Sequence, residues 1–97
     1  MEILKKIDNS TVTLSLIGRL DTNTASELEA AIHDINLVDL ILDCEKLEYV
    51  SSAGLRVLLL IQKKVNNSIK SFTLINVCED VKEVLHMTGF LSIINIK

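Results

Sequence analysis

The chain contains no proline and no tryptophan, and it has only three glycines, two phenylalanines and one tyrosine. So little proline and glycine excludes long flexible linkers and low-complexity tracts. Hydrophobic residues make up 48% of the sequence although aromatics make up only 3%, so the core must be aliphatic. A length of 97 residues predicts one domain spanning residues 1–97.

Neither sign of charge dominates, because 10 Lys and Arg face 13 Asp and Glu, for a formal net charge of −3. There is no basic patch of the kind that binds nucleic acid or anionic membranes. The N-terminal residues lack the apolar stretch of a signal peptide, and the longest apolar run, 57–61, is too short to span a bilayer. We therefore expect a cytoplasmic protein without nucleic-acid partners or direct membrane insertion.

The cysteines, Cys44 and Cys78, form no CxxC pair, and no histidine stands at metal-ligand spacing from either. Their surroundings predict small buried hydrophobic residues in a reducing compartment. We expect neither a metal site nor a cofactor.

Hydrophobic periodicity predicts strands that alternate with helices. The strands are expected at 3–6, 11–17, 38–43, 71–75 and 93–96, and the helices at 24–35, 55–65 and between 76 and 89, with a loop at 45–50. This order predicts an α/β fold with a mostly parallel central sheet of four to five strands and helices packed against it. The predicted core contains Leu14, Leu16, Leu40, Leu42, Leu58, Ile61 and Leu74.

Local signals mark the ends of two helices. Thr24 and Glu27 have the spacing of a capping box, in which the two side chains bond helix-end amides. Asn76, with Glu79 three residues on, predicts the cap of the last helix, and Gly89 suits the position just past its end.

Two adjacent serines, Ser51 and Ser52, stand where a strand gives way to a helix, within the segment LEYVSSAGLRVL at 47–58. The first amides of a helix lack internal acceptors and carry partial positive charge, so a phosphate on a serine there would be stabilised. A serine in this place is also an ordinary N-cap, and the residues alone leave both interpretations open.

Three segments together resemble one family. The segment at 47–58 is similar to the strand, Asp-Ser-Ser-Gly-Leu loop and helix that mark STAS domains, with Ser51 where the family usually has Asp. GRLDTNTA at 18–25 resembles the family's Gly-x-Leu-Asp turn, and the Val-x-x-Val-Leu-x-x-Thr-Gly-Phe pattern within 76–90 resembles its third marker. In this order and over the whole chain, they indicate a STAS domain of the anti-sigma-factor antagonist type.

The resemblance implies that Ser52, two residues before Gly54, is the phosphorylated serine, with Ser51 as the alternative acceptor. Asp21 matches the family's loop aspartate near that serine, and it equally suits a turn that leads into a helix. Helical spacing places Leu60 towards the polar side of its helix, beside the switch. The expected partner-binding residues are Asp21, Thr22, Ser51, Ser52, Gly54, Arg56 and Leu60.

The resemblance also implies a mechanism, partner switching in bacterial transcription regulation. The unmodified anti-anti-sigma factor binds an anti-sigma factor, which is itself a serine kinase, and so releases a sigma factor. The kinase phosphorylates Ser52 to end the complex, and a serine phosphatase resets it. The chain is then a phosphoprotein and not an enzyme. The alternative is a cytosolic STAS regulatory subunit of a transporter or sensor complex.

A hydrolase is the competing enzymatic interpretation, because residues 50–54 imitate a Gly-x-Ser-x-Gly nucleophile elbow, followed by Asp80 and His86. Val50 occupies the place where the elbow requires glycine. Asp80 and His86 also fall on one short predicted helix, at a spacing that keeps their side chains apart. We therefore reject this interpretation.

Overall fold

The computed structural model describes all residues from Met1 to Lys97. Its elements follow in the order β1 (Glu2–Asp8), β2 (Thr11–Leu20), α1 (Ala25–His33), β3 (Asp39–Asp43), β4 (Leu47–Val50), α2 (Ser52–Lys63), β5 (Ser71–Ile75), α3 (Glu79–Met87), the 3-10 helix η1 (Phe90–Ser92) and β6 (Asn95–Ile96). The predicted α/β fold is confirmed.

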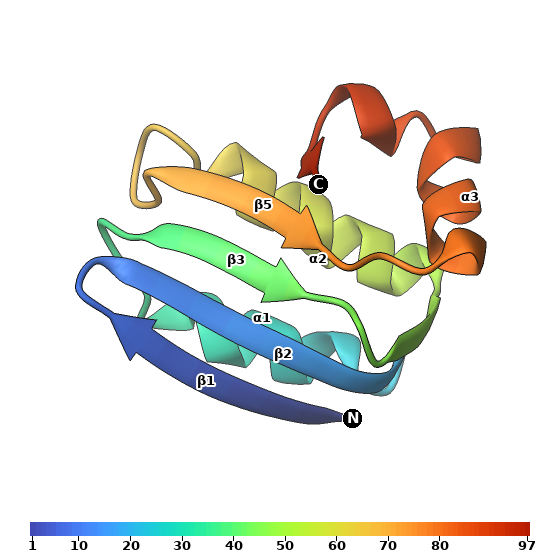
Figure 1. Ribbon diagram of the computed structural model, residues 1–97, viewed down its shortest axis with the longest axis horizontal. Helices are drawn as coiled ribbons and strands as arrows, with labels where there is room; N and C mark the ends of the chain where they lie inside the picture. The colour runs from blue at the N-terminus through green and yellow to red at the C-terminus, as the bar shows by residue number, and fades with distance from the viewer.

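The strands form one six-stranded sheet in the order β1-β2-β3-β5-β6, with β4 paired to the end of β2. β1 runs antiparallel to β2, and the other pairs are parallel. Helices α1 and α2 lie behind the sheet, while α3 lies at the end where β4 is found (Figure 1). The other face of the sheet carries no helix.

The sheet has one strand more than the four to five predicted, because residues 47–50 form β4 and not a loop. Only the two ends of β4, Leu47 and Val50, are buried, so the strand lacks the alternation that predicts a strand. It pairs only with Gly18–Leu20 of β2, across an irregular register at Gly18. Gly18 has φ 109°, a backbone conformation that glycine adopts most easily.

The core lies between the sheet and the two helices behind it. All seven residues predicted for it are buried within one cluster of 23 residues. Phe72 is the one aromatic member of this cluster, so the prediction of an aliphatic core is also confirmed. Cys44 belongs to it, and burial, then the negative charge of Asp43 and the neighbouring Cys78, raise the pKa of its thiol to about 12.

The capping box predicted for α1 does not form. Thr24 has helical dihedral angles instead of the extended ones that aim a cap at its own helix, and it makes no side-chain cap bond. Its hydroxyl turns back and donates to the carbonyl oxygen of Arg19 at 2.7 Å. The side chain that bonds a backbone N–H just before α1 is that of Asp21, whose carboxylate accepts the Thr24 N–H at 3.2 Å.

The last helix also begins differently from the prediction, at Glu79 with Cys78 as its N-cap. Asn76 has φ 57°, and its side-chain amide donates to the Asp43 carboxylate at 3.1 Å, joining the ends of β3 and β5. Gly89 lies just past α3 with φ 81°, as predicted. No helix has the length and apolar character to cross a membrane.

Candidate functional site

The parallel pairing of β2 with β4 brings two loops together at one end of the sheet. Leu20 pairs with Val50, so Asp21 and Ser51 each follow a paired residue. The backbone N–H of Ser51 donates to the carbonyl oxygen of Leu20 at 2.9 Å. The strand pairing therefore places the Asp21 turn beside the start of α2 (Figure 1).

The two serines occupy different environments. Ser51 is the N-cap of α2, with an extended backbone, and its hydroxyl accepts the N–H of Gly54 at 3.3 Å. Ser52 is the first residue of the helix, and its side chain is exposed and makes no hydrogen bond within the chain. The hydroxyl of Ser51 therefore holds the helix end, and that of Ser52 is free to react or to contact a partner.

Gly54 is buried, which changes the role expected for it. A β-carbon at this position would lie 2.8 Å from both the Cγ and the carbonyl oxygen of Leu20. Only glycine lets α2 start this close to β2. Gly54 therefore fixes the position of the serines relative to β2.

Asp21 organises the neighbouring turn. One of its carboxylate oxygens accepts the N–H groups of Asn23, at 3.0 Å, and of Thr24, and lies 3.2 Å from the Thr24 hydroxyl oxygen. This is the turn role that the sequence left open. Thr22, at the tip of the same turn, is exposed.

The pair formed by Arg19 and Tyr49 was missed by sequence reasoning. These two residues pair across β2 and β4, and the Arg19 guanidinium carbon lies 4.2 Å from the centre of the Tyr49 ring. Arg19 Nε also lies 3.8 Å from an Asp21 carboxylate oxygen. The stack gives the Asp21 turn an exposed cationic and aromatic flank. Predicting residues 47–50 as a strand beside β2 would have brought Arg19 and Tyr49 together.

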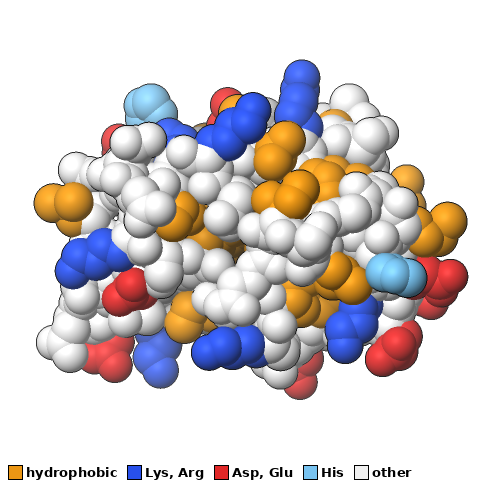
Figure 2. Space-filling view, turned by 90° about the horizontal axis from the view of Figure 1, so that it is seen from above, with side chains coloured by type: hydrophobic (Ala, Val, Ile, Leu, Met, Phe, Trp, Pro, Cys, Tyr) orange, Lys and Arg blue, Asp and Glu red, His pale blue; other side chains and the backbone are white.

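The outer face of α2 continues the surface that begins at Ser52. Arg56 is exposed one turn after Ser52, and Leu60, one turn further, is 37% exposed. Residues four apart share a helix face, so these side chains form one stripe. Figure 2 views the molecule from above Figure 1, from the long side on which η1 lies, and shows hydrophobic side chains gathered among Lys and Arg side chains.

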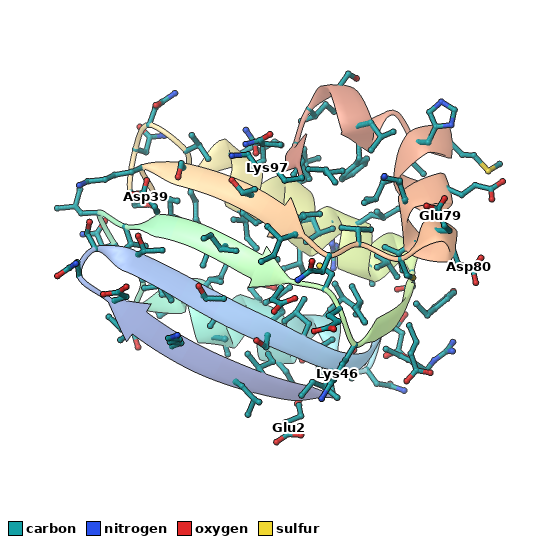
Figure 3. All side chains as sticks on the ribbon, viewed as in Figure 1. Glu2, Asp39, Lys46, Glu79, Asp80 and Lys97 are labelled. Atoms are coloured by element: carbon teal, nitrogen blue, oxygen red, sulfur yellow. The ribbon has the colours of Figure 1, made fainter.

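The hydrolase constellation is not assembled. Asp80 and His86 are exposed on α3, whereas both serines belong to the start of α2. The Asp80 side chain points away from the sheet (Figure 3). No group of three or more His, Cys, Asp and Glu side chains could hold a metal ion. The residues brought together at the sheet end are those of a turn and a helix start.

The family follows from comparison with known proteins. The family model described as the STAS domain matches residues 2–97. The chain belongs to the STAS domain family. It is 36% identical over 93 residues to BtrV of Bordetella bronchiseptica, which is assigned to the anti-sigma factor antagonists, covering 93% of this chain and 79% of BtrV.

Solved structures give the same fold. An anti-sigma factor antagonist from Mycobacterium paratuberculosis superposes with a TM-score of 0.87 at 22% identity, covering 98% of this STAS domain and 83% of that chain. Unphosphorylated SpoIIAA gives a TM-score of 0.71 at 16% identity over 99% of this chain and 87% of its own. Phosphorylated SpoIIAA from Bacillus gives 0.65 at 17% identity, covering 99% and 91%. The antagonist function predicted from the sequence agrees with the function for which BtrV is named.

Proposed function

We propose that this STAS domain acts in the cytoplasm, where it binds an anti-sigma factor and thereby frees a sigma factor for transcription. We further propose that a phosphate on Ser52 ends this binding. The observation that carries the proposal is the exposed, unbonded hydroxyl of Ser52 at the first position of α2. The similarity to BtrV supports the class of partner.

The start of α2 suits a phosphate. The backbone N–H groups of Ser52 and Ala53 precede the first helical bond of α2 and have no acceptor within the chain. These groups and the helix dipole favour an anion at this position. Arg56, one turn further along the same face, supplies a positive charge. A phosphorylated chain should therefore remain folded.

The effect of the phosphate should appear at the interface. A phosphate adds about −1.5 to −2 charges at neutral pH. The proposed partner is a serine kinase whose own site holds the phosphates of ATP, and like charges across an interface cost several kcal/mol. The chain is substrate and ligand in this cycle and not a catalyst. A serine phosphatase would restore the binding form.

The surface proposed for the partner combines α2 with the neighbouring turn. Ser52, Arg56 and Leu60 are exposed along the helix, and Thr22 is exposed in the turn. Arginine and apolar side chains with a polar rim are typical of protein interfaces. Asp21, Ser51 and Gly54 fix the geometry of this surface. Asp21 bonds the turn, Ser51 caps α2, and Gly54 packs against β2.

The test uses the full chain as bait, in its wild-type form and as Ser52→Ala and Ser52→Asp. The captured partner is identified, purified and added to sigma-dependent transcription in vitro. We expect an ATP-binding kinase that inhibits transcription, and relief of that inhibition by wild type and Ser52→Ala but not by Ser52→Asp. Capture of a transporter ATPase, with no effect on transcription, would instead favour a regulatory subunit and overturn the proposal.

A further inference from the structure

The outer edge of β1 is a long, regular and uncovered sheet edge. β1 ends the strand order, and all residues from Glu2 to Asp8 pair with β2 without a bulge. The chain has no proline to interrupt this edge. Leu4 and Ile7 are 51% and 63% exposed, and no element covers the outer edge of the strand (Figure 1). An edge of this kind is a template for another strand.

Even-numbered and odd-numbered side chains of β1 lie on opposite faces of the sheet. Leu4 pairs with Ser15 and Lys6 with Thr13, on the sheet face that carries no helix, and Glu2 and Asp8 share this face. A two-fold axis that joins two β1 strands antiparallel stands perpendicular to the sheet. It keeps both helix layers on the same side, so even-numbered residues must face even-numbered residues.

Charge and the length of pairing together select one register. Centring the axis on Ile7 would put Lys6 opposite Asp8 twice, but it would pair only residues 6–8 of the strand. Centring the axis on Lys5 would put Lys5 opposite Lys5 and Glu2 opposite Asp8, and centring it on Lys6 would put Lys6 opposite Lys6. Centring it on Leu4 puts Leu4 opposite Leu4 and places Glu2 opposite Lys6 twice. Directly opposed unlike charges and apolar pairs stabilise antiparallel strands, whereas opposed like charges destabilise them.

We propose that the occupant of this edge is a second copy of the same chain, joined through β1 in the register centred on Leu4. The two sheets then form one continuous sheet, and Lys5 faces Ile3 of the other copy on the helix side. An interface made by one edge strand is small, which predicts a weak, concentration-dependent dimer. The start of α2 takes no part in it, so Ser52 stays exposed in the dimer, and the proposal does not depend on the switch.

A charge swap tests the register. Sedimentation equilibrium at low salt compares the wild-type chain with Glu2→Lys, Lys6→Glu and the double variant. Each single change puts like charges opposite each other twice, so the dimer dissociation constant should rise about tenfold, and the double variant should return to within about threefold of wild type. Glu29→Lys, an equal charge change at an exposed position of α1, should have no effect. A wild-type chain that stays monomeric at millimolar concentration overturns the proposal, as does a double variant weaker than both single ones.

Cross-linking tests the same register by position. Under copper phenanthroline oxidation, Leu4→Cys should form a covalent dimer, because its two copies face each other at the axis. Asp8→Cys should form no more dimer than wild type, because residue 8 lies beyond the paired residues. Efficient cross-linking of Asp8→Cys but not of Leu4→Cys contradicts the proposed register.

Discussion

Gly54 packs so closely against Leu20 that a β-carbon on Gly54 would lie 2.8 Å from both the side-chain Cγ and the carbonyl oxygen of Leu20. The same carbonyl oxygen accepts the N–H of Ser51 at 2.9 Å. One backbone group of β2 therefore fixes both the N-cap of α2 and the distance of the helix from the sheet. The position of the exposed Ser52 depends on this contact.

Gly54→Ala should destabilise the domain by about 1–3 kcal/mol, because the added methyl must push backbone apart in a filled core. Urea unfolding followed by circular dichroism measures this change. Gly89→Ala is the matched control, since nothing lies within 4 Å of a β-carbon there and the cost comes from φ 81° alone. We expect a cost of about 1 kcal/mol for the control. Equal urea midpoints for wild type and Gly54→Ala would contradict the close packing.

Leu42→Ala tests the core. Leu42 is fully buried in the middle of the sheet, paired with Leu14 and Leu74 on the neighbouring strands. Removing its side chain should leave a cavity and cost about 2–5 kcal/mol of unfolding free energy. Ile41→Ala on the same strand, which faces away from the helices and is only half-buried, should cost clearly less. A larger loss for Ile41→Ala would reverse the assigned faces of β3.

Periodicity was sufficient to predict most of this fold. The strands around Leu14, Leu42 and Leu74 alternate strongly because one face of the sheet is buried and the other open. β4 was missed because a short strand that pairs only at the end of β2 is defined by its partner. The caps predicted at Thr24 and Asn76 failed for a related reason. Both side chains had tertiary or turn partners that local sequence does not reveal.

For the candidate site too, the sequence predicted the positions of residues along the chain but not their contacts. Ser51 and Ser52 could be placed at a helix start because the apolar pattern changes there, but their separate roles depend on which hydroxyl reaches the N–H of Gly54. The burial of Gly54 and the stack of Arg19 on Tyr49 both require the pairing of β2 with β4. Sequence patterns predict elements well, and contacts between elements less well.

Leu37 offers a stabilising change. It has φ 57° and its side chain is 61% exposed, so the residue has a left-handed backbone with little packing in return. Leu37→Asn should raise the unfolding free energy by about 1 kcal/mol, because asparagine tolerates this conformation better. Leu37→Ala removes the same exposed side chain but keeps the unfavourable φ, so it should give no such gain. Thermal melts of both variants decide between backbone strain and surface hydrophobicity, and equal gains would exclude strain as the cause.

Leu60→Glu tests the outer face of α2 as a partner surface. Leu60 is 37% exposed, so glutamate should be accommodated with a stability change of about 0.5 kcal/mol or less. Binding of the partner should weaken about tenfold or more if Leu60 is packed in the interface. Leu91→Glu in η1, at a site 39% exposed, is the control and should bind normally. Gross unfolding of Leu60→Glu would show a core role, and unchanged affinity would remove Leu60 from the interface.

Ser52 is the proposed phosphate acceptor of the switch. Incubated with the cognate kinase and ATP, wild type and Ser51→Ala should gain one phosphate on Ser52, and Ser52→Ala should gain none while still binding the kinase. Ser52→Asp should bind weakly. Ser51→Ala should also lose about 1 kcal/mol of stability, because the alanine cannot cap α2. Mass spectrometry locates the phosphate, and calorimetry measures each affinity.

The phosphorylated chain separates a switch at the interface from unfolding. Because the phosphate meets the free N–H groups of Ser52 and Ala53 and the dipole of α2, its urea midpoint should equal or exceed that of the unmodified chain. Its affinity for the kinase should nevertheless fall about a hundredfold or more, as expected for like charges brought together across an interface. Phosphate on Ser51, with Ser52→Ala labelled as well as wild type, would move the acceptor by one residue. Equal affinities of the phosphorylated and free chains would exclude phosphate as the switch, because the charge would then change nothing that the partner detects.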